Sequence, residues 1–190
     1  MSAHKFDPKK LKKLNNPQRL TDIPAEYVWD KLSNKTPQTI VEIGAGTAFF
    51  CKAFLQHSQP ERIYACDLST IMIEWMEKHV TPQYPVIVPV QTGESQVPLD
   101  STLSDLVFTI NLHHELEQPE QLIKESRRLL QPGGEIIIID WKKQEMQDGP
   151  PIHIRCTPEK ISSQLQSSGF EEISVYDELK KHFVVVAKKP

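Results

Sequence analysis

The sequence predicts an α/β fold built on a mostly parallel β-sheet, and two features of the chain lead to this prediction. Short apolar segments bounded by turn-forming residues, typical of strands buried in a parallel sheet, alternate along the chain with helical patterns. The last two strand segments, residues 170–178 and 182–187, are separated by three residues, which is too few for a crossover helix. These segments must pair antiparallel, so we expect an antiparallel strand at the C-terminal end of the sheet.

Residues 1–37 precede the first strand and are expected to form a helical lead-in or lid. Lysines surround Leu11 and Leu14 in a short basic helix after Pro8, and a second helical pattern extends from about residue 24 to residue 32. The lysines are either a solvated helix face or part of a segment that folds over a ligand pocket.

The first strand, residues 39–43, leads into a turn of small residues. Its apolar run is interrupted only by Glu42, and Gly44, Ala45 and Gly46 then follow it. Glycine carries no Cβ atom, so the backbone N–H groups of this turn can approach a ligand above the sheet. This arrangement suits a nucleotide-like ligand, and the alternative is a tight turn that uses glycine for its geometry alone.

The spacing of the small residues distinguishes between two kinds of nucleotide-binding turn. A dinucleotide fingerprint requires a third glycine at the position of Phe49, so NAD binding is poorly matched. The alternative spacing, acidic-x-Gly-x-Gly-x-small, fits Glu42, Gly44, Gly46 and Ala48. With this spacing the stretch resembles motif I of the class I S-adenosylmethionine (SAM)-dependent methyltransferases, with alanine at residue 48 where that family usually has glycine.

The second strand, residues 62–66, is followed by Asp67, roughly twenty residues after the glycine turn. A carboxylate at the end of the second strand can accept both hydroxyl groups of a nucleoside ribose. A helix is expected over residues 70–79, with Ser69 placed to cap it. The alternative is that Asp67 only caps this helix.

Residues 85–90 are expected to form the third strand, and Pro89 indicates that this strand lies at or near the edge of the sheet. A polar loop follows it. Many members of the resembled family place an acidic residue near the start of this loop, where it contacts the adenine amino group. Glu94 is the candidate for that contact here, with plain solvent exposure as the alternative.

The fourth strand, residues 105–110, ends in a polar cluster that contains Asn111, His113 and His114. The carboxyl ends of parallel strands meet at one edge of a sheet, so we expect this cluster beside the glycine turn. Imidazole titrates near neutrality, which makes either histidine a candidate general base, and lining or capping the loop is the alternative role. Adjacent histidines cannot both face one point, so we expect no metal site.

An amphipathic helix, residues 119–130, and a strand of isoleucines, residues 135–140, come next. The string RRLLQPGGEIIIID resembles the corresponding helix, turn and fifth strand of class I methyltransferases. Asp140, Trp141 and Arg155 follow this strand on the ligand side and are candidates for substrate contact. A place for Trp141 in the core is the alternative.

Length, composition and charge restrict the class of protein. The chain has 190 residues, of which 38% are hydrophobic, and a formal net charge of -3. These values fit one α/β domain with a buried core and give no indication of a general nucleic-acid-binding surface. Three cysteines without a pairing pattern indicate reduced thiols, and no apolar run reaches the ~18 residues that a membrane span requires. We therefore expect a soluble, cytoplasmic protein with a single domain.

The resemblance covers residues 39–190 and implies a SAM-binding core at 38–190 behind the lead-in at 1–37. It implies a three-layer sandwich with a seven-stranded, mostly parallel sheet, and SAM as the cofactor. The layout is also similar to a group of small methyltransferases distantly related to the ubiquinone and menaquinone biosynthesis enzymes. The residues expected to contact SAM are Glu42, Gly44, Ala45, Gly46, Asp67, Leu68, Glu94 and Asn111.

Methyl transfer is a one-step in-line displacement, for which the protein supplies alignment, a dry pocket and, for some acceptors, a base. We expect a small-molecule acceptor, with His113 or His114 as the base for a hydroxyl or protonated amine. Lysines at the N-terminus and at residues 142, 143, 180 and 181 leave an RNA or protein methyltransferase as an alternative. A nucleotide-binding protein that keeps the fold without catalysis is the other alternative, and the oligomeric state stays open.

Overall fold

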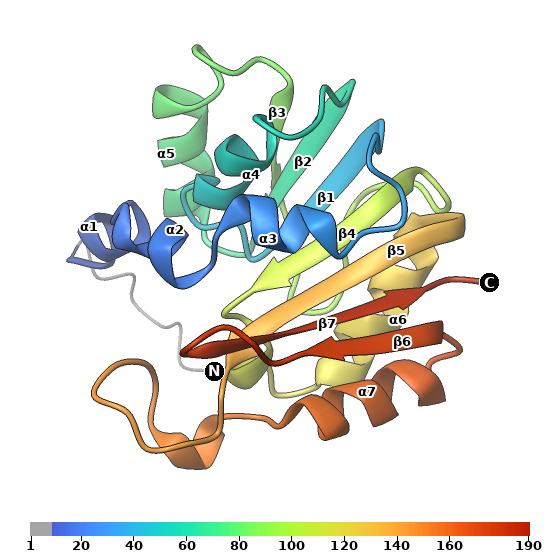
Figure 1. Cartoon of the computed structure of the whole chain (residues 1–190). Helices are drawn as coiled ribbons and strands as arrows, with labels where there is room; N and C mark the ends of the chain where they lie inside the picture. Colours follow the sequence, from blue (N-terminus) through green and yellow to red (C-terminus); the bar gives the residue numbers. More distant parts are fainter. Residues whose placement is uncertain (1–8) are drawn as a thin grey trace.

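The computed structural model describes residues 9–190, and every structural statement below concerns this part of the chain. The expected helix start at Pro8 lies outside it. Seven strands form one sheet in the order β3-β2-β1-β4-β5-β7-β6 (Figure 1). Their bounds are β1 (Thr39–Ile43), β2 (Arg62–Asp67), β3 (Ile87–Gln91), β4 (Ser104–Ile110), β5 (Leu130–Trp141), β6 (Glu171–Tyr176) and β7 (His182–Lys188).

The predicted directions of the strands are confirmed. In the spatial order of the sheet, the five strands β3, β2, β1, β4 and β5 are parallel to their neighbours. β7 runs antiparallel to both β5 and β6. β3, which contains Pro89, is an edge strand, as expected for a residue without an N–H group. β5 begins at Leu130 instead of the predicted Glu135, because Leu130 pairs with Ser104 and the Pro-Gly-Gly segment continues the strand with an irregular register.

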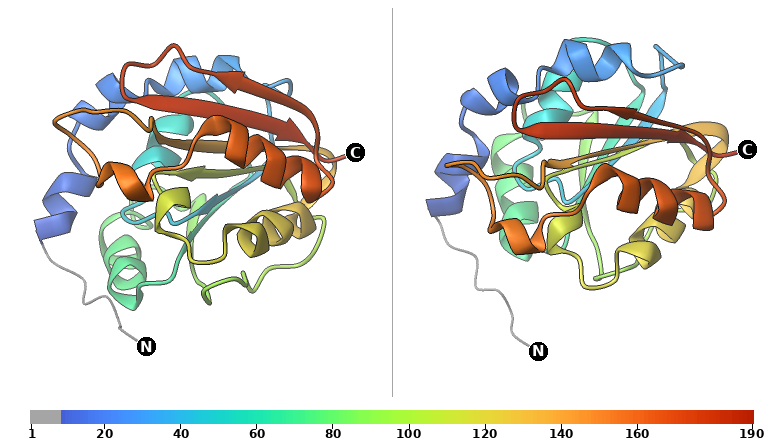
Figure 2. Two further views of the ribbon diagram at one scale, coloured as in Figure 1. Left: turned by 90° about the horizontal axis from the view of Figure 1, so that it is seen from below. Right: turned by 60° about the horizontal axis from the view of Figure 1, so that its bottom comes forward.

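Helices cover both faces of the sheet, which confirms the three-layer architecture (Figures 1 and 2). One face carries α3 (Ala25–Asp30), α4 (Phe49–Phe54) and α5 (Thr70–His79), and the other carries α6 (Pro119–Leu129) and α7 (Pro158–Ser167). Side chains of β5 alternate between two buried clusters: Ile137 and Ile139 join the first, and Ile136 and Ile138 the second. The isoleucine run is therefore buried on both sides, as its pattern predicted.

The N-terminal segment contains three helices, α1 (Lys9–Leu14), α2 (Gln18–Asp22) and α3. The sequence predicted only two, and α2 is an additional helix of five residues. α3 belongs to the core, because Trp29 is buried and its ring lies 5.4 Å from that of Phe54 in α4. The Glu135 carboxylate accepts the N–H groups of Ser33 and Asn34 at 2.9 to 3.1 Å, which fixes the chain after α3 to the sheet.

The ends of the parallel strands form one side of the molecule, which we call the rim. Figure 1 shows α1, α2 and the loop after β5 together on this side, at the left, and Figure 2 agrees. Two short 3₁₀ helices, η1 (His113–Glu115) and η2 (Ile152–Ile154), follow β4 and β5. No helix in residues 9–190 is long and apolar enough to cross a membrane.

Candidate active site

Hydrogen bonds fix the turn after β1 to the end of β2. The N–H groups of Gly44 and Ala45 both donate to the carbonyl oxygen of Cys66, at 2.8 and 2.9 Å. Gly44 (φ 76°) and Gly46 (φ 56°) adopt left-handed conformations that favour glycine, and so does Ala48 (φ 51°). The left-handed conformation costs an alanine roughly 1–2 kcal/mol, so residue 48 is a strained position where the resembled family usually has glycine.

Asp67 lies on the same rim as the glycine turn and contacts it directly. Its Oδ2 accepts the Gly46 N–H at 2.7 Å, and its Oδ1 accepts the Ser69 N–H at 2.8 Å. Each carboxylate oxygen keeps a lone pair for a further donor, such as a ribose hydroxyl. Burial raises the pKa of Asp67 above its usual range. Ser69 is the N-cap residue of α5, as predicted, but its side chain makes no capping hydrogen bond; its own backbone N–H donates to Asp67.

Two leucines lie against the glycines of the turn. A methyl group added at Gly44 would be 2.8 Å from Leu112 Cδ2, and one added at Gly46 would be 3.3 Å from Leu14 Cδ1. Leu112 comes from the loop after β4 and Leu14 from α1, so two separate elements enclose the turn. The small residues are thus needed for this packing as well as for the approach of a ligand, which the sequence did not predict.

Glu42 lies below the turn on β1 and is buried, with 3% of its surface exposed. The Cys51 thiol of α4 donates to Glu42 Oε2 at 2.7 Å. Burial raises the pKa of Glu42 to about 8, although the thiol and the positive charge of Arg19 oppose this shift. With this pKa Glu42 is mostly protonated at neutral pH, and an approaching cation would favour its ionised form; its contact with a cofactor stays a prediction.

His114 and Asp140 form a buried pair where β4 and β5 end. Nδ1 of His114 lies 2.7 Å from Asp140 Oδ1, and the backbone N–H of His114 donates to Asp140 Oδ2 at 2.9 Å. A carboxylate only accepts, so Nδ1 carries the proton and Nε2 is left as the basic nitrogen. Asp140 is fully buried and also accepts the Trp141 N–H, at 2.7 Å. Asp140 thus holds the His114 ring in place, and its expected contact with substrate stays a prediction.

His113 has different surroundings from its neighbour. Its side chain is buried, and Nε2 donates to Gln164 Oε1 of α7 at 2.9 Å, while the Gln164 amide donates to Glu120. Burial lowers the pKa of His113. The burial and the hydrogen bond hold the His113 ring against the α6–α7 layer. The geometry therefore favours a structural role for His113 in the loop after β4, which was the alternative to catalysis.

Arg155 organises the loop after β5. The side chain is buried, and its guanidinium group donates to four backbone carbonyl oxygens at 2.8 to 3.1 Å, those of Lys142, Gln144, Asp148 and Pro150. These bonds use four of its five donors, so the structure gives the predicted substrate contact of Arg155 no support, and that contact stays a prediction. Trp141 packs beneath the same loop, with its ring centroid 4.2 Å from that of His182, which supports the core position weighed for this residue.

Four of the seven buried side-chain atoms without a hydrogen-bond partner in the described residues lie at the rim. Among the described residues these include Thr47 Oγ1 in the turn, Asn111 Oδ1 after β4 and both ring nitrogens of His182 at the start of β7. Folded proteins pair nearly all such atoms, so the rim is built for a polar ligand, and a nucleoside with an amino-acid tail fits it. Asn111 also has a left-handed backbone (φ 58°), a strain that clusters at functional sites. No pattern in the sequence singled out Thr47 or His182.

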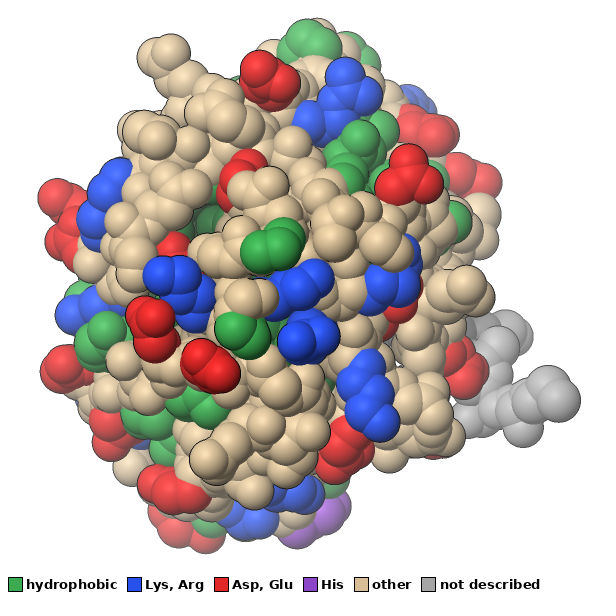
Figure 3. All heavy atoms as spheres, turned by 90° about the vertical axis from the view of Figure 1, so that its right-hand side faces the viewer, with side chains coloured by type: hydrophobic (Ala, Val, Ile, Leu, Met, Phe, Trp, Pro, Cys, Tyr) green, Lys and Arg blue, Asp and Glu red, His purple; other side chains and the backbone are tan. Residues whose placement is uncertain are grey.

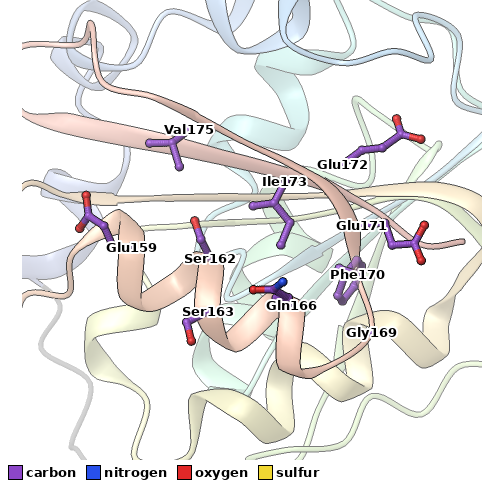
Figure 4. A pocket seen from close by; sticks show the side chains of 10 residues that line it. All are labelled: Glu159, Ser162, Ser163, Gln166, Gly169, Phe170, Glu171, Glu172, Ile173 and Val175. Atoms are coloured by element: carbon purple, nitrogen blue, oxygen red, sulfur yellow. The ribbon is translucent and has the colours of Figure 1, made fainter.

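The remaining predicted residues lie on exposed loops. Leu68 is 55% exposed after β2, and Glu94 is exposed in the loop after β3, where its adenine contact stays a prediction. A separate open groove of about 750 Å³ lies between α7 and β6, and Figure 4 shows the residues that line it. None of the predicted site residues is among them. In residues 9–190 no three His, Cys, Asp or Glu side chains are placed to hold a metal ion.

Known proteins share this arrangement. Residues 41–138, which are 98 of the 190, match the family described as a methyltransferase domain. The chain is 23% identical over 168 residues to the uncharacterized methyltransferase YdaC of Bacillus subtilis, covering 87% of this chain and 91% of that protein. It is 36% identical over 102 residues to the malonyl-[acyl-carrier protein] O-methyltransferase of Hahella chejuensis, covering 53% of this chain and 36% of that one.

A solved structure extends the likeness to almost the whole chain. The crystal structure of a SAM-dependent methyltransferase from Aquifex aeolicus superimposes with a TM-score of 0.84 and 28% sequence identity, over 96% of this chain and 98% of that one. The matched residues include the glycine turn, Asp67 and the His114 loop. The chain therefore belongs to the methyltransferase domain family and is a SAM-dependent methyltransferase of class I.

Proposed function

We propose that the methyl acceptor is a small molecule with a hydroxyl or amine group and that His114 removes the proton of this group. The buried His114–Asp140 pair is the observation that carries the proposal. Asp140 fixes the orientation and the tautomer of the imidazole and leaves Nε2 to accept a proton, as a general base requires.

Each group at the rim then has a defined task. Bound SAM supplies a methyl group on a positively charged sulfur. Asp67 and the turn of residues 44–46 hold the adenosyl part in a fixed position, which aligns the reacting atoms. His114 takes the acceptor proton, and Asp140 stabilises the imidazolium that results. Leu14 and Leu112 cover the turn and keep water away from it.

The charges of the described surface support a small acceptor over RNA. Two of the lysines that suggested nucleic acid are paired: Lys142 lies 3.1 Å from Asp177, and Lys181 lies 3.1 Å from Asp22 and 2.7 Å from Asp148. Figure 3 shows the side of the molecule opposite the rim, where acidic and basic side chains are interspersed.

The curated relatives differ in the acceptors that their names print, which are a malonyl-[acyl-carrier protein] oxygen in one and a tRNA cytidine nitrogen in another. The Hahella chejuensis protein is, by its name, an O-methyltransferase, and it shares 36% of its residues with this chain over the matched region. The chain spans about a third of that protein's length, so its carrier-protein substrate is not carried over. A small hydroxyl compound is the acceptor class that combines an oxygen nucleophile with a base.

Purified protein incubated with SAM and a panel of small hydroxyl and amine compounds tests the proposal, with S-adenosylhomocysteine as the product that is measured. For a compound that is methylated, we expect His114→Asn to lower kcat by about 10²- to 10⁴-fold, the range for loss of a general base. The affinity for S-adenosylhomocysteine, measured by calorimetry, should change by less than about twofold, because His114 is not a predicted cofactor contact.

His113→Asn is the matched control, since it changes the adjacent histidine and should leave kcat near that of the parent protein. If His114→Asn keeps full kcat, or if only carboxylate or thiolate compounds are methylated, the base assignment is wrong. If labelled methyl groups pass to RNA and to none of the small compounds, the acceptor class is wrong.

A further inference from the structure

Arg19 is a cation above the glycine turn to which the sequence assigned no role. It lies on α2, and its Nη1 donates to the Leu14 carbonyl oxygen at 2.7 Å. The guanidinium carbon lies 4.7 Å from the ring centroid of Phe50 and 5.2 Å from that of Phe49, the residues that follow the turn. Leu14 itself contacts the position above Gly46, so this arginine is held directly beside the turn.

Most donors of this guanidinium have no partner within the described chain. An arginine side chain has five N–H donors. Within residues 9–190 the Arg19 guanidinium makes one hydrogen bond, to the Leu14 carbonyl, and no carboxylate lies within ion-pair distance of it. A half-buried guanidinium with free donors and two aromatic rings under one side is well suited to bind a planar anion.

The charges on either side of the turn match those of an amino acid. Glu42 is buried on β1 at the start of the turn, and Arg19 packs on the phenylalanines that follow the turn. SAM carries an ammonium group and a carboxylate on the same carbon atom. The guanidinium group is complementary to the carboxylate, and the ammonium group would favour the ionised form of Glu42.

We propose that Arg19 binds the methionine carboxylate of SAM, while Glu42 faces the ammonium group. This inference rests on the SAM dependence of the family and is independent of the acceptor and of His114. This contact would assign a function to the N-terminal segment, because a ligand bound by both Arg19 and the glycine turn links α2 to that turn. Cofactor binding then holds α1 and α2 over the rim as a lid, the role that the N-terminal lysine-rich segment suggested.

Two ligands that differ by the amino-acid group provide the test. S-adenosylhomocysteine contains the carboxylate and the ammonium group, and 5′-methylthioadenosine keeps the adenosyl and sulfur atoms but lacks both. In calorimetry, we expect Arg19→Met to weaken S-adenosylhomocysteine binding about 10- to 100-fold, as expected for a lost hydrogen-bonded charge pair. Binding of 5′-methylthioadenosine should change by less than about twofold. Arg19→Lys should recover part of the loss, since it keeps the charge without the fork of donors.

Arg62→Met is the matched control, because Arg62 is exposed at the opposite end of β2 and should have no effect on either ligand. Equal loss of both ligands in Arg19→Met would mean that Arg19 only supports the turn, and unchanged binding of S-adenosylhomocysteine would remove the contact; either result overturns the proposal. If Arg19→Met does not fold, the test uses the parent protein, and the affinity of the decarboxylated analogue is compared with that of S-adenosylhomocysteine. That analogue should bind at least about 10-fold more weakly, and equal affinity overturns the proposal.

Discussion

Three buried histidines near the rim differ in how their nitrogens are satisfied. His114 pairs with Asp140, and His113 donates to Gln164. His182 is 1% exposed, and neither of its nitrogens has a partner among the described residues. Burial lowers the pKa of His182 to about 4, so its ring is neutral at neutral pH. A neutral imidazole with two unpaired nitrogens costs stability, which is the usual signature of a residue retained for binding.

Opposite stability changes are therefore expected at two of these residues. His182→Leu should stabilise the folded protein by about 1–3 kcal/mol, because it removes two buried nitrogens without partners. His113→Leu, the matched control, should destabilise it by about 1–3 kcal/mol, since the Gln164 oxygen then loses its donor. Urea denaturation of both variants measures the free energy of unfolding. Destabilisation by His182→Leu would show that its nitrogens are hydrogen-bonded in solution.

The sign of the pH dependence at His182 follows from the same burial. The folded-state pKa of about 4 lies below the usual value of 6.5, so the unfolded chain binds more protons between these two values. Stability from this group is present above pH 6.5 and is lost as the pH falls toward 4. The stability gain of His182→Leu should therefore be larger at pH 5 than at pH 7.5.

At the scale of elements, the loop after β5 depends on one side chain. Arg155 donates to four backbone carbonyls between Lys142 and Pro150, although this loop has no secondary structure over that stretch. Lys181 adds an ion pair from the β6–β7 connection to Asp148 of the loop and to Asp22 of α2. The acceptor side of the rim is therefore shaped by contacts among three segments that are distant in the sequence.

Arg155→Lys should destabilise the protein by about 2 kcal/mol, because a lysine cannot reach four carbonyls that a planar guanidinium group binds together. The loop should also be cut faster in limited proteolysis, at sites between residues 142 and 150. Arg127→Lys is the comparison variant, since Arg127 makes a single exposed bond to the Gly169 carbonyl. Equal protease resistance of the Arg155→Lys and Arg127→Lys proteins would contradict the role of Arg155.

At the scale of the whole molecule, α3 connects distant parts of the fold. Its Trp29 packs on Phe54 of α4, and its Tyr27 hydroxyl donates to Glu178 between β6 and β7. The Lys31 ammonium lies 4.4 Å from the ring centroid of Tyr27 and 4.7 Å from that of Tyr176. We therefore propose that the segment up to residue 37 and the core from residue 38 unfold as one unit.

Trp29→Ala should lower the free energy of unfolding by about 3–5 kcal/mol, the usual cost of removing a fully packed tryptophan. Far-UV circular dichroism and the fluorescence of Trp75 and Trp141 should change together in this variant, as they should in the parent protein. Leu20→Ala is the control, because Leu20 of α2 is 37% exposed and its removal should be nearly neutral. An earlier unfolding transition seen only by circular dichroism or only by fluorescence would contradict a single cooperative unit.

Local patterns in the sequence determined the fold and half of the site. The isoleucine run, the Pro89 edge strand and the short 179–181 connection each predicted a feature that depends on a few neighbouring residues. The glycine turn and Asp67 were predictable for the same reason: each follows directly from the end of a parallel strand, and such ends meet at one rim. The family and the cofactor follow from these features.

Only the tertiary structure decided which polar side chains face a ligand. Asp140 and Arg155 follow the right strand, yet one holds His114 and the other holds a loop, because long-range packing brought hydrogen-bond partners to them. Arg19, Thr47 and His182 carry no signal in the sequence, since a donor without a partner is defined by what surrounds it in space. Strand order is encoded locally, whereas the satisfaction of buried polar groups depends on the whole assembled chain.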